Sequence, residues 1–150
     1  MAPDESATLK LRAEDAEDLA VISACLQDAL VPVRDLAYVP EDRTFLFVAN
    51  RFRWENGLSP APGEAAYERT LCGITFSEVA AVSYNGFRRS DDGRILSLLA
   101  IRSDDRAVHL EFSGGATIRL EVTRIVCLAK DLGEPWPTQW QPRHDVDEQA

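Results

Sequence analysis

Residues 9–55 constrain the fold more than any other part of the chain, because they combine a helix signal with a hairpin signal. Asp15 is placed to cap the helix, and two carboxylates follow it in the first turn, where they complement the helix dipole. Apolar residues then recur at intervals of three and four, the pattern of one buried helix face. They are Leu19, Ile22, Leu26 and Ala29. Since Pro32 disfavours helical backbone just before it, we predict a helix over residues 16–30.

A hairpin follows this helix. Residues 40–43, Pro-Glu-Asp-Arg, have the composition of a tight turn. Pairing Val39 with Thr44 across this turn places Tyr38 opposite Phe45 and gives an aromatic cross-strand pair. Both faces of the hairpin are largely apolar near the turn, so we expect it to be covered on both sides.

Alternation of apolar and polar residues predicts the remaining strands. They are expected at residues 8–12, 71–76, 79–84, 95–101, 108–112 and 118–122. The second and third of these are either separate strands or one strand that bends near Ser77 and Glu78. Residues 56–69 contain two glycines and two prolines and are expected to form a loop.

The apolar pattern also assigns a register to the last hairpin. A three-residue loop at residues 114–116 sets Phe112 opposite Ile118 and Leu110 opposite Leu120, so that apolar residues pair with apolar ones and polar residues with polar ones. A two-residue loop would turn every side chain to the wrong face. A glycine is available for the left-handed position of the longer loop.

Together these patterns predict one α+β domain over residues 8–133. Its sheet is expected to be mostly antiparallel, with about seven strands, curled or barrel-like, and packed on one main helix at residues 16–30. A hotdog-type sheet that wraps around this helix is a variant of the same prediction. Residues 1–7 are expected to be frayed, and residues 134–150 to form an extended tail that contains tryptophan and proline.

One run of sequence also carries a resemblance to a known family: LKLRAEDAEDLAVISACLQDALVPVRDLAYVPEDRTFLFVANRFRWE. Over this run, and again through residues 107–133, the chain resembles a small alphaproteobacterial family catalogued only as a domain of unknown function. The resemblance covers most of the chain. It implies no activity, cofactor or catalytic residue.

The charge balance excludes several classes of partner. The chain has 25 acidic and 16 basic residues, a net charge of −9. A field of that sign opposes binding to a nucleic-acid backbone or to an anionic membrane surface. No segment approaches the roughly 18 consecutive apolar residues of a membrane span. We therefore expect neither a nucleic acid nor a membrane as a partner.

The three cysteines, Cys25, Cys72 and Cys127, lie in distant segments, and no C-x-x-C pair is present. Their spacing excludes a zinc ribbon and a thioredoxin-type redox motif. Residues 1–6 lack the basic and apolar regions of a signal peptide. We therefore expect reduced, buried thiols and a cytoplasmic protein.

Candidate catalytic residues are few. Catalysis by a nucleophile and a base requires a histidine or lysine near a serine, threonine or cysteine. The chain has two histidines, and His144 falls in the tail. His109 is expected on the polar face of a strand, opposite Glu121, as a solvated cross-strand pair. Motifs for a metal, a phosphate group or a nucleophilic serine are absent, so we expect no catalytic residue, metal or cofactor.

The best candidates for a ligand site are Arg51 and Arg53. On a strand they project from one face about 7 Å apart, so that they can clamp a carboxylate or phosphate. Alternatively, they form the solvated end of a strand and pair with acidic residues. Arg88, next to Arg89 in a loop, forms a second small basic cluster with the same two interpretations.

Trp136 and Trp140 are the candidates for contact with a partner. Both are interleaved with prolines, which excludes a helix. Since exposed indoles are unfavourable, the tail either folds back onto its own domain or docks on another protein.

Three functions remain open. The first is a non-catalytic interaction or regulatory protein that binds another protein through a sheet face or through the tail, and the missing catalytic and metal motifs favour it. The second is a binding module for a small anionic ligand, which uses Arg51, Arg53 and Arg88. The third is an enzyme with dispersed carboxylate or thiol residues. Exposed sheet faces are also compatible with a homodimer.

Overall fold

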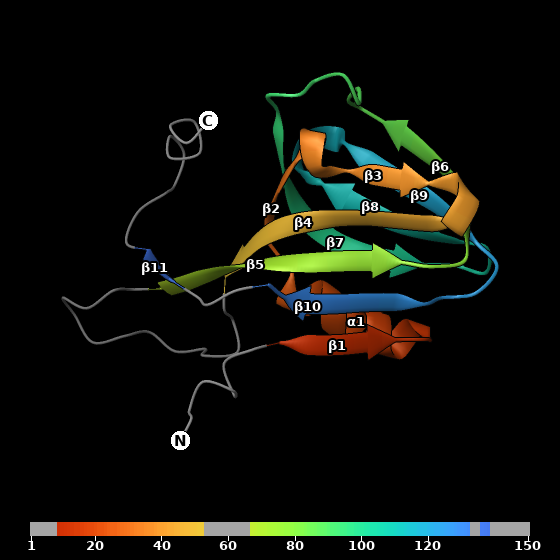
Figure 1. Cartoon of the computed structure of the whole chain (residues 1–150), viewed down its shortest axis with the longest axis horizontal. Helices are drawn as coiled ribbons and strands as arrows, with labels where there is room; N and C mark the ends of the chain where they lie inside the picture. Colours follow the sequence, from red (N-terminus) through yellow and green to blue (C-terminus); the bar gives the residue numbers. More distant parts are fainter. Residues whose placement is uncertain (1–8, 53–66, 133–135, 139–150) are drawn as a thin grey trace.

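The computed structural model describes residues 9–52, 67–132 and 136–138. These residues form one helix and one large antiparallel sheet (Figure 1). The elements are, in chain order, β1 Lys10–Ala13, α1 Ala16–Cys25, β2 Leu30–Pro32, η2 Val33–Asp35, β3 Ala37–Val39, η3 Pro40–Asp42, β4 Thr44–Phe52, β5 Tyr67–Phe76, β6 Val79–Asn85, β7 Ile95–Ser103, β8 Ala107–Phe112, η5 Ser113–Gly115, β9 Thr117–Val122, β10 Cys127–Asp131 and β11 Trp136–Thr138.

The sheet has eleven strands, in the order β1-β10-β5-β4-β2-β7-β8-β9-β6, with β3 paired to β4 and β11 paired to β5. The predicted α+β class and the antiparallel sheet are confirmed. The prediction of about seven strands is wrong. Two strands that it lacks, β2 and β11, have three residues each and are too short to show a period. The curled or barrel-like form, and with it the wrapped variant, is wrong as well. The end strands β1 and β6 do not pair with each other, and the sheet is neither closed nor strongly curled.

Helix α1 begins as predicted. Asp15 caps it, and its Oδ1 accepts a hydrogen bond from the backbone N–H of Asp18 at 2.8 Å. The helix ends at Cys25, so the predicted range of residues 16–30 is too long. Asp28 adopts a left-handed φ of 66° and donates its N–H to the carbonyl of Leu98 at 2.7 Å. Pairing with β7 therefore replaces the last predicted turn of the helix.

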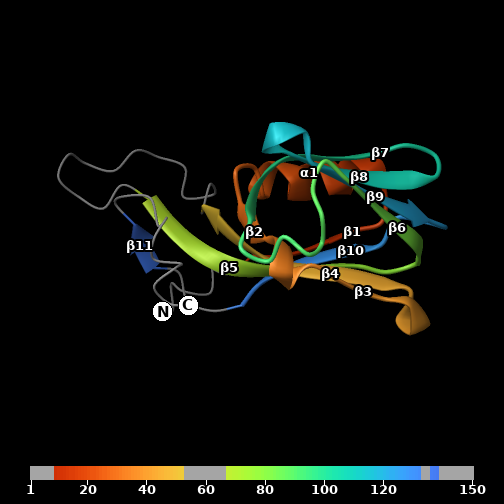
Figure 2. The ribbon, with the colours of Figure 1, turned by 90° about the horizontal axis from the view of Figure 1, so that it is seen from above.

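The core lies between α1 and the strands. Figure 2 shows the helix beside β7, on one side of the layer formed by β1, β10, β5, β4 and β3. Ser23 on the helix accepts the N–H of Ile101 on β7 at 2.8 Å. All four apolar positions of the predicted helix face are buried, although Ala29 lies beyond the helix. The largest apolar side chains that are fully buried include Phe45, Phe76, Leu19, Ile74 and Ile118.

The β3–β4 hairpin has the predicted register, with Val39 opposite Thr44 and Tyr38 opposite Phe45. The Tyr38 hydroxyl donates to the carbonyl of Val79 at 2.8 Å, which ties the hairpin to β6. The expectation that both faces of the hairpin are covered is wrong. Phe45 is fully buried, but its neighbour Leu46 is 37% exposed on the other side of the sheet.

The β8–β9 hairpin has a three-residue loop, as predicted, but the loop is Ser113–Gly115. Leu110 is opposite Ile118 and His109 is opposite Arg119, so the predicted partners of Phe112 and His109 are wrong. The apolar faces are nevertheless correct, because moving the loop by one residue moves the pairing by two. Gly114, with a φ of 76°, and the glycine after it supply the two left-handed positions that set the loop one residue earlier.

Strands β5 and β6 meet at a sharp bend, where Glu78 has a φ of 60°. They are two strands, and β5 begins at Tyr67, so the loop predicted for residues 56–69 is too long at its end. Beyond β10, the strand β11 follows the same edge of β5 in the same direction, with Asp131 opposite Cys72 and Trp136 opposite Arg69. Within the described residues, no helix is long and apolar enough to cross a membrane.

Candidate functional site

Strands β4, β5 and β10 carry two chemically different faces. Their inner face supplies the core beneath α1. The opposite surface is called here the outer face. It carries Leu46, Val48, Leu71, Gly73, Leu128 and Leu132, with the polar residues Asn50 and Thr75 among them. The register joins these strands side by side, with Val48 opposite Gly73 and Gly73 opposite Lys130. The outer face is therefore a continuous surface and not a set of scattered residues.

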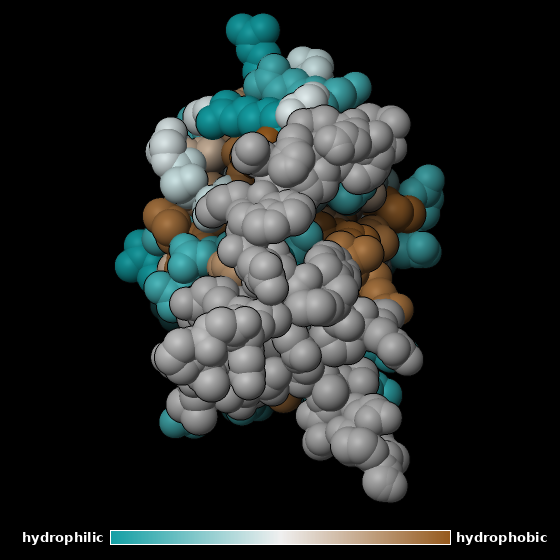
Figure 3. All heavy atoms as spheres, turned by 90° about the vertical axis from the view of Figure 1, so that its left-hand side faces the viewer, coloured by the Kyte–Doolittle hydropathy of each residue, from teal (hydrophilic) through white to brown (hydrophobic). Residues whose placement is uncertain are grey.

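The outer face is both apolar and open to solvent. Leu71 is 42% exposed and Leu132 is 54% exposed, whereas Ile74 on the inner face is fully buried. The side chain of Leu132 lies over Gly73, with its Cδ2 3.3 Å from the position that a Cβ would occupy. Apolar side chains gather on the right-hand side of Figure 3, which is the side of the outer face.

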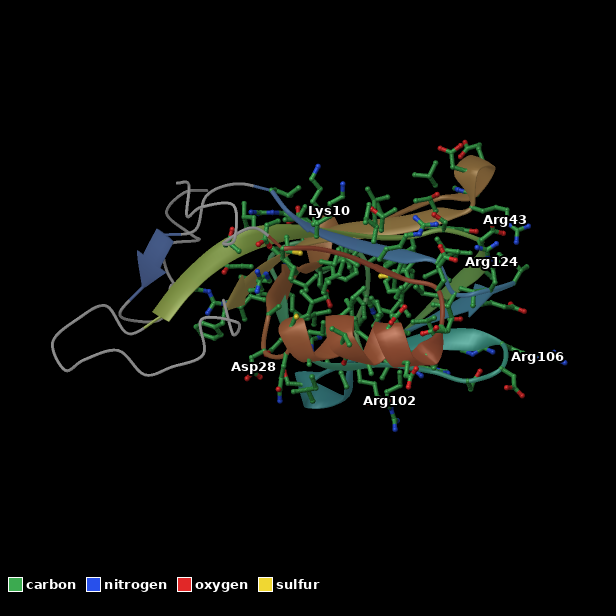
Figure 4. All side chains as sticks on the ribbon, turned by 90° about the horizontal axis from the view of Figure 1, so that it is seen from below. Lys10, Asp28, Arg43, Arg102, Arg106 and Arg124 are labelled. Atoms are coloured by element: carbon green, nitrogen blue, oxygen red, sulfur yellow. The ribbon has the colours of Figure 1, made fainter. Side chains whose placement is uncertain are left out.

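Two lysines border this surface. Lys10 on β1 is directly opposite Lys130 on β10, and both are exposed. They are the only two lysines of the chain. Figure 4 shows Lys10 projecting from the side of the sheet that faces away from the helix. A pair of ammonium groups thus lies next to the exposed leucines.

Arg51, the first candidate for a ligand site, is buried. Its side chain is 0% exposed and that of Asp131 is 2% exposed. Nε of Arg51 donates to Oδ1 of Asp131 at 2.9 Å, Nη2 donates to Oδ2 at 2.8 Å, and Nη1 donates to the carbonyl of Phe52 at 3.0 Å. Oδ2 of Asp131 also accepts the N–H of Leu9 at 2.8 Å. Arg51 pairs with an acidic residue, as the second interpretation expected, but the expectation of a solvated position is wrong because the pair is buried. Arg53 lies outside the described residues, so their joint clamp stays a prediction.

Sequence reasoning missed Arg69, at the start of β5. It is 2% exposed and stacks on Phe52, with the guanidinium carbon 3.8 Å from the ring centroid. Nε donates to Oδ1 of Asn50 at 2.6 Å, and Nη2 donates to the Asn50 carbonyl at 2.9 Å. Burial lowers the pKa of Arg69 to about 10, against the opposing effect of the Asp28 carboxylate, so it remains charged at neutral pH. No signal in the sequence marked it, because its partners come from another strand.

Arg88 is exposed in the loop between β6 and β7. Its backbone N–H donates to Oδ2 of Asp91 at 3.2 Å, which is a turn interaction. Its neighbour Arg89 is directed to Tyr84, with the guanidinium 5.5 Å from the ring centroid. Arg51 is buried on β4, whereas Arg88 lies in an exposed loop, and a role for Arg88 in ligand binding stays a prediction.

His109 and Asp104 form a polar pair at the turn between β7 and β8. Nε2 of His109 is 2.8 Å from Oδ2 of Asp104, and Oδ1 of Asp104 accepts the N–H groups of Arg106 and Ala107, each at 2.9 Å. The bonds to the backbone of Arg106 and to His109 hold the pKa of Asp104 at about 2. These residues line a surface depression of about 320 Å³ together with Arg102, Ser103 and Glu111. Asp104 accepts hydrogen bonds from the backbone of the turn and also contacts the imidazole of His109. These contacts explain the pair as a structural feature that closes the β7–β8 turn.

Two of the cysteines are unsuited to nucleophilic chemistry. Cys72 and Cys127 are buried, and burial raises the pKa of each thiol to about 12. The nearby Asp131 carboxylate raises the pKa of Cys72 further. Both thiols are therefore protonated at neutral pH, and the thiolate is the reactive form. The expectation of buried thiols is confirmed for these two, whereas Cys25 is only half-buried.

The tail residues are described in part. The backbone of Trp136 pairs with Arg69 in β11, so this stretch of the tail lies on its own domain. Trp140 and His144 lie outside the described residues, and their contact with a partner stays a prediction. Among the residues that the structure describes, no group of three or more His, Cys, Asp or Glu side chains is arranged to hold a metal ion.

Comparison with known proteins gives a family without an activity. No curated protein and no solved structure matches the chain. One family model, for a protein of unknown function (DUF2948), matches residues 9–144. The resemblance to a family of unknown function is thereby confirmed. The chain belongs to the DUF2948 family of proteins of unknown function.

Proposed function

We propose that this protein is a non-catalytic interaction domain that binds another protein on the outer face. The observation that carries this proposal is the exposure of Leu46, Leu71 and Leu132 on one side of strands whose other side is a packed core. Contiguous exposed apolar surface with a polar border is typical of protein–protein contacts. A partner would bury Leu46 and Leu71 with little loss of backbone conformational entropy, because both already lie in paired strands. The N–H of Leu132 donates to the carbonyl of Leu71 and holds that residue beside them.

The shape of this surface also favours a protein over a small molecule. Small ligands bind in concave pockets that bury most of their surface. The outer face is one face of a sheet. The depression lined by Asp104 and His109 lies elsewhere, at the turn between β7 and β8. A broad partner that covers several strands at once fits this geometry.

The two other functions are less well supported. Asp131 binds one edge of the Arg51 guanidinium through Nε and Nη2, and Nη1 donates to the carbonyl of Phe52, so an anion clamp would depend on Arg53. An enzyme would need an activated nucleophile, and Cys72 and Cys127 are buried thiols of raised pKa. Both functions stay predictions.

Paired variants test the proposal. Leu71→Asp and Leu132→Asp place a charge on the outer face, and Leu99→Asp, at a residue on β7 that is 48% exposed, is the matched control. Tagged wild-type protein and each variant are used to recover bound proteins from an extract of the native organism, with quantification by mass spectrometry. We expect a specific partner to be retained by the wild type and by Leu99→Asp and lost with both outer-face variants. Equal recovery with all four proteins would contradict the proposal.

Light scattering on the same proteins decides whether the partner is a second copy. A monomer at every concentration supports a different protein as the occupant. A dimer that dissociates with Leu71→Asp but not with Leu99→Asp would overturn the proposed partner and assign the outer face to self-association.

A further inference from the structure

We infer that the partner segment on the outer face is acidic as well as apolar, with carboxylates that pair with Lys10 and Lys130. This inference rests on the proposed function and names the chemistry of its partner. It follows from the placement of two like charges opposite each other on neighbouring strands, where no carboxylate of the described residues neutralises them.

The two ammonium groups face each other across neighbouring strands. Residues directly opposite in an antiparallel pair have Cβ atoms about 4.5–5.5 Å apart, and like charges there are destabilising. Lys10 and Lys130 are such a pair. On the next strand, Gly73 lies opposite Lys130, and the side chain of Leu132 lies over Gly73. Two positive charges and an exposed leucine therefore lie on adjacent strands of one surface.

Some exposed cations among the described residues form ion pairs, whereas these two lysines do not. Arg12 is paired with Glu14, and Arg102 with Glu111. Within the described ranges 9–52, 67–132 and 136–138, no carboxylate lies within 4.0 Å of Lys10 or Lys130.

The net charge of the protein would restrict an acidic partner to the surface around Lys10 and Lys130. A net charge of −9 repels an acidic partner from most of the surface. The lysine pair offers attraction beside the exposed leucines, so it would set the orientation of an acidic segment whose apolar side chains reach Leu71 and Leu132. An anionic membrane presents charge over its whole plane and meets the net repulsion, which favours a protein segment as the occupant.

Defined probes test the inference directly. Three labelled peptides of equal length are used: one alternates leucine with aspartate or glutamate, one alternates leucine with lysine, and one alternates leucine with serine. Binding to the full-length protein is measured by fluorescence anisotropy at low and high salt, and contacts are mapped by NMR shifts. We expect binding of the acidic probe alone, weakened by salt, with shift changes at Leu71, Leu132 and Lys130.

Charge variants test whether the lysines are responsible for binding of the acidic probe. Lys10→Glu combined with Lys130→Glu should weaken the acidic probe at least about tenfold. The matched control is Arg102→Gln, which removes an exposed cation on β7 away from the outer face. The single variant Lys130→Glu should raise the melting temperature of the free protein by about 1–3 °C, because it converts a like-charge pair into an opposite one. A lowered melting temperature would overturn the inference and assign Lys130 a structural role.

The outcomes separate the inference from the proposed function. If Leu71→Asp removes the native partner while the lysine variants bind both partner and probe unchanged, the inference fails and the proposed function stands. If neither the leucine variants nor the lysine variants change binding of the partner or the probe, both the inference and the proposed function fail. If the protein binds vesicles that contain phosphatidylglycerol through Lys10 and Lys130, and binds no acidic probe, a membrane replaces the protein segment and the inference is overturned.

Discussion

Two arginine–carboxylate pairs in this protein have the same chemistry and opposite surroundings. Arg51 and Asp131 have side chains that are 0% and 2% exposed, whereas Arg102 and Glu111 have side chains that are 68% and 31% exposed. The buried pair is bidentate and also holds the N–H of Leu9 and the carbonyl of Phe52. It joins the ends of β4 and β10 to the start of β1, while the exposed pair links two neighbouring strands that already pair.

The difference teaches where an ion pair matters. Water screens the exposed pair and solvates either partner when the other is removed. A buried charge that loses its partner has no such substitute, so its removal is costly even where the intact pair contributes little. The three predictions below test this contrast in order of expected effect.

The largest effect is expected from Arg51→Met. The variant leaves the Asp131 carboxylate buried without its cation and should lower the free energy of unfolding by about 3–5 kcal/mol. Urea denaturation followed by circular dichroism measures this loss. The control is the double variant Arg51→Met with Asp131→Leu, which removes both charges and should recover most of the loss, less the contribution of the Leu9 N–H acceptor. A single variant within about 1 kcal/mol of the wild type would contradict the contrast.

A smaller, pH-dependent effect is expected from Asp104→Asn. The folded pKa of Asp104 is about 2, below the roughly 3.9 of an unfolded aspartate. The carboxylate therefore stabilises the fold above about pH 4, and this contribution is lost as the pH falls towards 2. Wild type should be more stable than the variant at pH 7, and the two should converge in acid. Thermal melts from pH 2 to pH 7 measure this, and a difference that stays constant with pH would show that Asp104 acts only through its shape.

The smallest effect is expected from Arg102→Ala. Its partner Glu111 is half-buried and remains hydrated, so the loss should be about 0–1 kcal/mol and should shrink at high salt. A double-mutant cycle with Glu111→Ala isolates the pair from other changes. A coupling energy as large as that of the buried pair would contradict the expectation that burial makes the Arg51–Asp131 pair the more important of the two.

Signals that act over a few residues predicted the fold well. The Asp15 cap and the pairing of Tyr38 with Phe45 both depend on neighbours in the sequence, and both are confirmed. The end of the helix was mispredicted because a residue far along the chain, Leu98, accepts the N–H of Asp28. Apolar spacing continued through Ala29 because that residue belongs to the core without belonging to the helix.

The candidate site was harder to predict, because its features depend on long-range pairing. Arg51 and Asp131 are 80 positions apart, and nothing in the alternation of β4 distinguishes a buried arginine from a solvated one. The leucines of the outer face lie in patterns that predict burial, and only the arrangement of the strands shows which side lacks a helix. Lys10 and Lys130 become a pair only once β1 is placed beside β10.

The pairing of β1 with β10 also sets the order in which the chain can fold. Leu9 and Asp131 are 122 positions apart, and among the described strands β10 is the only one that pairs with β1. Contacts at such separation form late and slowly. During synthesis, the first strand and Arg51 must therefore wait until nearly the whole domain has left the ribosome. A chain that stops before Cys127 would retain the helix and most of the core, yet it would lack both the partner of β1 and the carboxylate that neutralises its largest buried side chain.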